Sequence, residues 1–430
     1  MPRDLDVVIW GATGYTGELA VAYLLGDESR IRSFPCEQPA APADLRWAVA
    51  GRSRSKLEAL GAGVETIVCD ADDKAGIEAF VKRARVVIGF AGPFQKYSDQ
   101  VVEACAKYGT HWCDITGEII WTRSLIDRFG DRARANGACI VNLCGYDSIP
   151  SDLGTLFAIN ALRSRAEYPL SPIRSVVNYQ MGLEGGGGGS LQTMLVGMTE
   201  PMQLSGGVDR ADPFLLGGEP AGGAREEDRP MKDAYFDAAL DSWIGPFIMQ
   251  GVNPLAVRRS SALLEYGSQF NYREVTACRN EEEAQRSVKF VNAPARPEEL
   301  RRMIEEGKLP QPGEGPSPEA RALARFQSTL VACNEAGESV TVTVTGAEVA
   351  YEETAKMAVE AGLALVYEGA SCPGVVSGGG FLTPAACMGT VLIQRLHRAG
   401  IRFDVVSDAA RRPAAEYAGE AIARFWAAEE

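Results

Sequence analysis

The heptapeptide GATGYTG, residues 11–17, is the part of this sequence whose residue types and spacing indicate chemistry most directly. It follows a short apolar run, residues 6–10, and precedes a segment with the apolar spacing of a helix. Glycines in such a turn let the backbone approach a pyrophosphate, and the free N–H groups of the helix attract its negative charge. The pattern predicts a dinucleotide phosphate loop, with a purely structural turn as the alternative. The residues expected to line it are Gly11, Thr13, Gly14, Tyr15, Thr16 and Gly17.

The end of the second expected strand, GRSRSK at 51–56, bears on which dinucleotide binds. An NAD site usually has an Asp or Glu here for the ribose 2′-hydroxyl, whereas an NADP site has a basic residue. This segment has three cations and no acid, at the start of a helix where the macrodipole disfavours positive charge. A 2′-phosphate would relieve that cost, with Arg52 forking onto it or stacking on the adenine and Ser53 capping the helix. We expect NADP rather than NAD, the alternative being a solvated basic turn.

Two further strand exits are expected to contribute to the same site. Asp70 ends the third strand, where its carboxylate would meet the adenine amine or, equally, cap the next helix. Gly92 and Pro93 follow the fourth strand, where a rigid turn would brace the nicotinamide or serve only as a turn.

The exits of the fifth and sixth strands carry the candidate catalytic residues. Ligands of an open α/β sheet lie outside the carboxyl ends of its strands, so acids and hydroxyls there are placed to move protons. We expect Tyr146 and Asp147, and less strongly Glu118, to have this role. The ordinary alternative is helix capping, which applies most readily to Asp114, Ser148 and Asp152.

The elements that must position these residues alternate regularly over the first 160 residues. Short apolar runs separated by helical segments predict a parallel sheet with helices on both faces, that is, a doubly wound α/β Rossmann domain. The expected strands are 6–10, 46–51, 64–70, 84–92, the segment beginning THWCD at 110, and 138–144.

The rest of the chain is expected to form a second α+β domain with a mixed sheet. Strands are expected at 175–183, 266–276 and 340–346, and a helix at 353–369. The boundaries we expect are 1–155 for the Rossmann domain, 156–380 for the second domain with a flexible Gly- and Pro-rich insert at 205–233, and 381–430 for C-terminal helices packing back on the Rossmann domain. Glycines 185–189 are read as a connector or as the hinge of a closing loop. Met194, Met198 and Met202 are read as core residues rather than as part of an acyl tunnel.

Composition excludes several other classes of protein. The 430 residues contain 43 Lys and Arg against 57 Asp and Glu, a net charge of −14, which argues against a general affinity for nucleic acid. Ten cysteines without a CxxC and only two histidines make a zinc cluster improbable, so no metal is expected. Buried thiols, together with no long apolar run or leader, indicate a cytoplasmic protein without a transmembrane segment.

Several long motifs, in this order, resemble the saccharopine dehydrogenase-like oxidoreductases. They are GATGYTG, THWCDITGE, CGYDSIPSDLG, GGGGGSLQTM, LPQPGEGPSPEAR, ETAKMAVEAGLAL and GGGFLTPAACMG. The later motifs are most similar to the branch that contains the mycobacterial trans-acting enoyl reductases. The insertions at 27–45 and 205–233 depart from the compact pattern of that branch and leave the substrate open.

The resemblance implies hydride transfer from NADPH to a C=C or C=N bond, with a small or lipid-like substrate and enoyl groups favoured. One alternative is a saccharopine-type amino-acid dehydrogenase, which would need arginines such as Arg258, Arg259 and Arg273 to converge on the cleft. Another is a non-catalytic nucleotide-binding protein. The sequence does not decide whether the protein associates peripherally with a membrane or lipid droplet, or whether it forms a homodimer.

Overall fold

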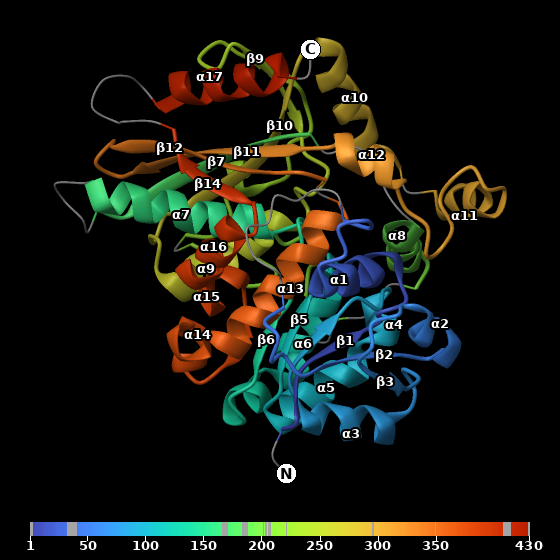
Figure 1. Ribbon diagram of the computed structural model, residues 1–430. Helices are drawn as coiled ribbons and strands as arrows, with labels where there is room; N and C mark the ends of the chain where they lie inside the picture. The colour runs from blue at the N-terminus through green and yellow to red at the C-terminus, as the bar shows by residue number, and fades with distance from the viewer. Residues whose placement is uncertain are drawn as a thin grey trace.

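The computed structural model describes residues 3–31, 41–165, 171–182, 188–200, 202, 204, 208–220, 222–294, 296–348, 350–406 and 414–428. In these residues the strands form two sheets of seven strands each. The two sheets lie one above the other in Figure 1, with the N-terminal half of the chain mostly below.

The lower sheet is parallel throughout and has the strand order of a doubly wound domain. In sheet order its strands are β13 (Gly380–Leu382), β6 (Cys139–Val141), β5 (His111–Asp114), β4 (Ala84–Gly89), β1 (Leu5–Trp10), β2 (Trp47–Gly51) and β3 (Glu65–Val68). β1 pairs in parallel with both β2 and β4, so the chain order reverses between β1 and β4. The predicted Rossmann domain is confirmed, and its ligand position is the switch point beside β1 and β4.

Helices cover both faces of this sheet. One layer contains α3 (Lys74–Arg83), α5 (Asp99–Tyr108) and α6 (Ile119–Ala135), and the other contains α1 (Tyr15–Leu25) and α13 (Glu352–Tyr367), with α16 (Thr390–Arg398) packed on α13. Short helices α2 (Arg54–Ala59) and α4 (Phe94–Tyr97) follow β2 and β4. α13 lies beside α1 although more than 300 residues separate them (Figure 1). It packs so closely on β4 that a Cβ on Gly362 would collide with the side chain of Ile88.

The upper sheet is mixed, as expected for the second domain. In sheet order its strands are β14 (Arg402–Val405), β12 (Ser339–Gly346), β11 (Phe326–Asn334), β7 (Ile173–Met181), β10 (Asn271–Cys278), β9 (Ser242–Pro246) and β8 (Tyr235–Asp237). β7 and β10 are parallel and the other pairs are antiparallel. α7 (Ile149–Arg165) packs on β11 and β12 below the sheet and α17 (Ala414–Ala427) packs on the same strands above it (Figure 1). The remaining helices are α8 (Gly188–Thr199), α9 (Asn253–Leu264), α10 (Glu281–Val291), α11 (Pro297–Glu305), α12 (Pro318–Leu323), α14 (Pro373–Val376) and α15 (Pro384–Cys387), with single turns η2 (Glu226–Asp228) and η3 (Gly369–Ser371).

The C-terminal segment does not return to the Rossmann domain as a unit. β13 joins the lower sheet and α16 packs on α13, but β14 and α17 belong to the upper sheet. The expectation that 381–430 pack back on the Rossmann domain is therefore wrong for β14 and α17. The apolar face of α17 (Ala418, Ile422 and Phe425) is buried against the upper sheet instead.

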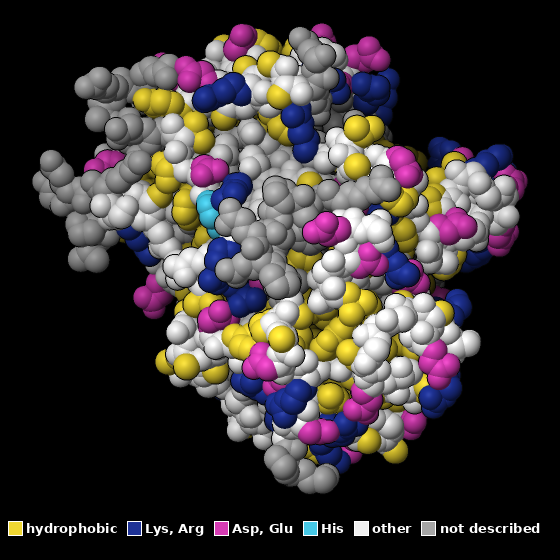
Figure 2. Space-filling view, viewed as in Figure 1, with side chains coloured by type: hydrophobic (Ala, Val, Ile, Leu, Met, Phe, Trp, Pro, Cys, Tyr) yellow, Lys and Arg dark blue, Asp and Glu magenta, His cyan; other side chains and the backbone are white. Residues whose placement is uncertain are grey.

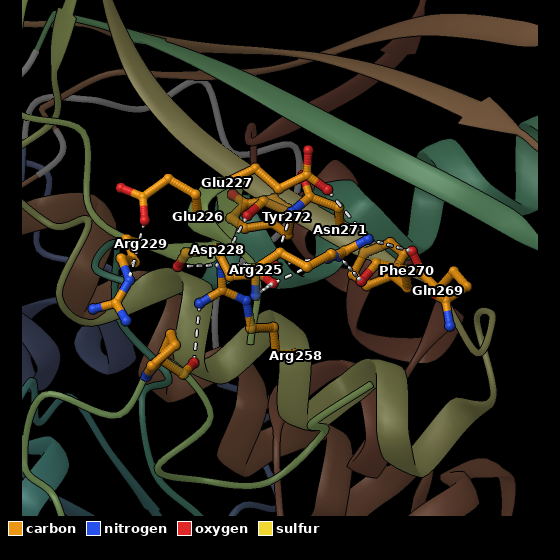
Figure 3. Close-up of polar contacts among 11 residues, drawn as sticks. Arg225, Glu226, Glu227, Asp228, Arg229, Arg258, Gln269, Phe270, Asn271 and Tyr272 are labelled. Atoms are coloured by element: carbon orange, nitrogen blue, oxygen red, sulfur yellow. Dashed lines mark hydrogen bonds and ion pairs between the residues drawn. The ribbon is translucent and has the colours of Figure 1, made fainter. Parts of the chain in front are cut away.

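The insert expected to be flexible is packed where the structure describes it, at 208–220 and 222–233. Figure 3 shows the polar contacts that surround buried Arg258 on α9. The Arg258 guanidinium donates to the carbonyl oxygens of Pro213 (3.0 Å), Asp228 (3.0 Å) and Tyr272 (3.2 Å). Asp228 in turn accepts from Asn271 on β10. These carbonyl-to-arginine contacts are not visible in a Gly- and Pro-rich sequence.

Candidate functional site

A cleft of about 2230 Å³ runs from the switch point of the lower sheet to the edge of the upper sheet. Figure 2 shows hydrophobic side chains exposed in the middle of the molecule's face, where the lower part meets the upper part. Lys and Arg side chains on this face are interspersed with Asp and Glu. The cleft therefore combines apolar side chains with many charged and polar groups.

The phosphate loop has the geometry that the glycine spacing predicts. Gly11 has a φ of +80°, and a Cβ there would lie 2.6 Å from the amide nitrogen of Ala91. A Cβ on Gly17 would collide with the carbonyl oxygen of Gly11, so this glycine closes the turn and does not line the cleft. A Cβ on Gly14 would meet nothing closer than 3.5 Å. The face of Gly14 that lines the cleft therefore leaves room for a phosphate next to the free N–H groups of α1. The loop residues that line the cleft are Gly11, Thr13, Gly14, Tyr15 and Thr16.

The basic segment after β2 separates into two kinds of residue. Arg52, Ser53 and Lys56 line the cleft, whereas Arg54 does not and pairs with Glu58 at 3.7 Å. Ser53 is the N-cap of α2 and accepts the N–H of Lys56, as predicted. Among the described residues, no hydrogen bond or ion pair involves the side chain of Arg52 or of Lys56. Two cations facing the cleft without a partner fit a bound 2′-phosphate.

Asp70 lines the cleft as well, but it does not cap the next helix. Its carboxylate accepts the N–H of Asp72 at 3.1 Å. The N-cap of α3 is Asp73, which accepts the N–H of Gly76 at 2.9 Å. The capping alternative for Asp70 is wrong, and its carboxylate keeps acceptor capacity at the place expected for the adenine.

Glu118 accepts hydrogen bonds from the backbone that follows the turn after β4. Gly92 and Pro93 line the cleft, and the short helix α4 begins immediately after them. Glu118 accepts the N–H of Phe94 at 2.6 Å and of Gln95 at 3.0 Å, so both of its oxygens serve the start of α4. Glu118 does not line the cleft. The structure thus gives it a positioning role rather than the catalytic role that the sequence suggested.

Asp147 is the carboxyl group best placed for proton transfer. It lines the cleft near Gly117, where a Cβ would lie 3.3 Å from the Asp147 Oδ2. No hydrogen bond to its carboxyl group occurs among the described residues. Burial raises the pKa of Asp147 to about 6, since the charged form is deprived of water without a compensating partner. A carboxyl group with this pKa is about one-tenth protonated at pH 7, far more than an ordinary aspartate.

Tyr146 also lines the cleft, but its hydroxyl is already engaged. The hydroxyl donates to Gln180 Oε1 on β7 at 3.3 Å, and the Tyr146 N–H donates to Thr354 Oγ1 on α13 at 3.1 Å. Burial raises the pKa of Tyr146 well above its ordinary value, so the phenol stays neutral. Its geometry suits a fixed wall or a neutral hydrogen-bonding group better than a proton source.

Sequence reasoning missed a buried polar group behind Tyr146. Glu274 on β10 accepts from Gln180 Nε2 at 2.8 Å and from Ser151 Oγ at 2.6 Å. Burial raises the pKa of Glu274 to about 7. Glu274 thereby fixes the amide of Gln180, whose oxygen takes the Tyr146 hydroxyl. Glu274, Gln180 and Ser151 come from β10, β7 and α7, and no local motif marks Glu274 or Gln180.

The arginines proposed for a saccharopine-type substrate do not converge on the cleft. Arg258 holds the insert, and Arg259 donates to the carbonyl oxygens of Leu216 and Phe381. Arg273 is exposed elsewhere on β10. Other arginines do line the cleft: Arg279, Arg286 and Arg325. The first two pair with the carboxylate of Glu283, at 3.0 and 3.9 Å, so their charge is partly neutralised.

The methionine prediction needs correction too. Met194 and Met198 on α8 are 43% and 36% exposed, so they are not core residues, and Met194 lines the cleft. Met202 alone packs against a hydrophobic core. The glycine run at 185–189 lies largely outside the described residues.

Comparison with known proteins agrees with this geometry. Residues 7–141 match the family described as the saccharopine dehydrogenase NADP-binding domain. A trans-acting enoyl reductase of Mycobacterium bovis is 30% identical, with 93% of this chain and 97% of that protein covered. A Mycobacterium tuberculosis protein whose name also carries the words trans-acting enoyl reductase is 32% identical over the same shares. Apo saccharopine dehydrogenase from Saccharomyces cerevisiae has a TM-score of 0.49 at 14% identity, covering 94% of this chain and 100% of that one.

The fold and the cleft define an NADP-binding oxidoreductase. The chain belongs to the saccharopine dehydrogenase-like oxidoreductases, within the branch of the trans-acting enoyl reductases. No helix in the described ranges has the length and apolar character needed to cross a membrane.

Proposed function

We propose that this protein is an NADPH-dependent reductase of a C=C bond conjugated to a carbonyl, an enoyl group, on a lipid-like substrate. The observation that carries the proposal is the cleft that joins the phosphate loop, the carboxyl group of Asp147 and an apolar wall to the cations Arg52 and Lys56, which have no partner among the described residues. The names of the relatives support the enoyl version, and a C=N bond is the alternative that the same groups would serve.

NADPH is favoured over NADH by charge. Arg52 and Lys56 face the cleft at the end of β2, where a ribose 2′-hydroxyl would call for an acidic acceptor. Asp70 stands one strand further on and suits the adenine amine. Gly92 and Pro93 form the wall to which we assign the nicotinamide end.

In the proposed reaction, this chain supplies orientation and a proton. Reduced nicotinamide, when bound, supplies a hydride to the β-carbon of the enoyl group. Protonated Asp147 then donates its proton to the α-carbon, so that the C=C π bond is replaced by two C–H bonds. Tyr146, held by Gln180 and Thr354, forms a fixed wall beside Asp147. The apolar side chains of the cleft exclude water from the reacting bond.

The apolar part of the cleft has room for a chain attached to the reacting group. Side chains from α8, the turn after β9, α10 and the end of α17 line it: Met194, Phe247, Ile248, Met249, Phe290 and Trp426. Such a wall gains free energy by burying methylene groups, about 0.8 kcal/mol for each. We therefore expect longer acyl chains to bind more tightly.

We place the protein in the cytoplasm, since its described cysteines are all free thiols and nearly all are buried. Such thiols persist in a reducing compartment.

The test is a titration with NADPH and NADH followed by a substrate screen. NADPH should bind at least tenfold more tightly than NADH, and NADPH should be oxidised in the presence of trans-2-enoyl-CoA, with a product two mass units heavier. Binding of NADPH without reduction of any enoyl thioester, enoyl lipid or imine would leave a non-catalytic nucleotide-binding protein as the better reading.

A further inference from the structure

Residues 309–321, the LPQPGEGPSPEAR motif, lie over the phosphate loop although they belong to the second domain. We call this segment the strap. Leu309, Pro312 and Gly313 of the strap line the cleft. A Cβ on Gly315 would collide with the ring of Tyr15, the fifth residue of GATGYTG. The strap therefore touches the dinucleotide loop directly, at a residue with no side chain.

Arg321, at the end of the strap, is buried and fixes this contact. Its Nη1 donates to the Tyr15 hydroxyl at 2.5 Å and to the Pro316 carbonyl oxygen at 2.9 Å. Its Nε donates to the buried carboxylate of Glu352 on α13 at 2.5 Å, and its Nη2 donates to the Arg30 carbonyl oxygen. Burying an arginine is costly unless its donors are satisfied. This arginine uses all three nitrogens to join the strap, the phosphate loop and α13.

The Tyr15 side chain is held in place by contacts of its hydroxyl and of its ring. Its hydroxyl donates to the Pro316 carbonyl oxygen at 2.5 Å. Its ring meets the ring of Tyr351 edge-on, with centroids 5.0 Å apart. Tyr15 is also the first residue of α1, so its backbone N–H is among the free donors that a pyrophosphate would accept. Contacts that hold the ring also restrict movement of the backbone to which that N–H belongs.

We propose that the strap is part of the dinucleotide site and that Arg321 is a positioning residue, holding Tyr15 so that the phosphate loop is preorganised for pyrophosphate. The proposal rests on the proposed NADPH binding and adds a contribution from the second domain. Preorganised N–H donors bind an anion more tightly because no ordering accompanies binding. Losing Arg321 should then weaken ligands that carry the pyrophosphate and spare ligands that do not.

The experiment compares two probes on the full-length protein. NADPH contains the pyrophosphate, whereas adenosine 2′-monophosphate contains only the adenine, ribose and 2′-phosphate that Arg52 and Lys56 face. Dissociation constants are measured by NADPH fluorescence and by competition. The first variant is Arg321→Met. The second is Tyr15→Phe, which removes one hydroxyl. The third combines Arg321→Met with Glu352→Gln, so that no buried charge is left unpaired. The control is Arg302→Met, because Arg302 is exposed on α11 near Glu306.

For Arg321→Met we expect NADPH to bind about tenfold more weakly and adenosine 2′-monophosphate to bind within twofold of the wild type. For Tyr15→Phe we expect NADPH to bind about threefold more weakly and adenosine 2′-monophosphate to bind within twofold of the wild type. This variant tests the proposal if Arg321→Met does not fold. Unchanged NADPH binding in the folded variants would overturn the proposal. Equal loss for both probes would also overturn it, because Arg321 would then only support the fold. A wild-type protein that binds neither probe would instead refute the proposed function itself.

Discussion

The carboxyl group of Asp147 has to carry a proton at the pH of the reaction if it is the acid. Its pKa, raised by burial to about 6, means that the protonated fraction falls about tenfold per unit above pH 6. We therefore expect the rate of NADPH-dependent enoyl reduction to fall as the pH rises from 6 to 8. In Asp147→Asn the rate should drop about 100-fold and this pH dependence should disappear. Steady-state rates at several pH values measure both effects.

The matched control is Asp72→Asn, the same change at another residue that lines the cleft. It should keep the rate and the pH profile. If Asp147→Asn keeps the wild-type profile, the proton comes from another group. NADPH affinity, measured separately, should be equal in both variants.

The choice of dinucleotide depends on Arg52. Replacing it by Ala removes a cation that faces the cleft and pairs with none of the described residues, so NADPH binding should weaken about 10- to 100-fold. NADH, which has no 2′-phosphate, should bind as before. The control is Arg54→Ala, since Arg54 lies two residues away but pairs with Glu58 outside the cleft. Equal effects of the two substitutions on NADPH would show a general charge effect rather than a phosphate contact.

At this scale the sequence predicts what depends on local chemistry. The phosphate loop, the Ser53 cap and Asp147 at a strand exit could all be found from residue type and position. Glu118 and Asp70 could not be assigned, because their roles depend on which N–H groups the folded chain brings to them. Glu274 lies beyond any local pattern.

The element α4 depends on Glu118. The two Glu118 oxygens accept the first N–H groups of α4, in the manner of an N-cap supplied by another helix. Glu118→Gln keeps one acceptor oxygen and removes the charge. We expect it to lower the free energy of unfolding by about 1–2 kcal/mol, as measured by urea denaturation. The pH dependence of the remaining activity should match that of the wild type. Loss of this pH dependence would indicate that Glu118 is a catalytic group.

The pair β7 and β10 carries the buried network around Glu274. With its pKa raised to about 7, native Glu274 keeps its proton over a range in which the unfolded chain has lost it. The unfolded state binds fewer protons there, so the free energy of unfolding should decrease as the pH rises from about 4.5 to about 7. In Glu274→Gln this contribution vanishes. Between pH 5 and 7 the wild type should lose about 2–3 kcal/mol more than the variant in urea denaturation. Equal slopes would contradict the raised pKa.

Elements within one local pattern were predictable, and elements defined by distant partners were not. Five of the six N-terminal strands are short and almost entirely buried because helices cover both of their faces, whereas β3 at the edge of the sheet is partly exposed. β13 has only three residues in a glycine-rich segment, and it is a strand because the edge of β6 is there to pair with it. The apolar stripe of α17 predicts a buried face, but not which of the two sheets buries it.

Helices from the middle and the late part of the chain connect the two sheets of the molecule. α13 covers β1, β4 and β5 of the lower sheet, and Arg321 ties it to the strap. α7 runs from the end of the lower sheet onto the upper one and contacts α15 and α16. Neither sheet has a complete core without these crossing elements. This interleaving is the reason that boundaries drawn along the sequence do not separate the two layers.

A single cooperative unit is therefore expected, and Gly362 offers a way to test it. A side chain there would collide with Ile88, so Gly362→Val should force α13 away from β4 and destabilise the fold by about 1–3 kcal/mol. If the two sheets unfold together, hydrogen exchange should speed up by the same factor in the most protected amides of β4 and of β11. Gly130→Val is the control, since a Cβ at Gly130 meets nothing within 4 Å and any effect there reports helix propensity alone. Loss of protection in β4 with β11 unchanged would show two independent domains, and the strap would then join units that fold separately.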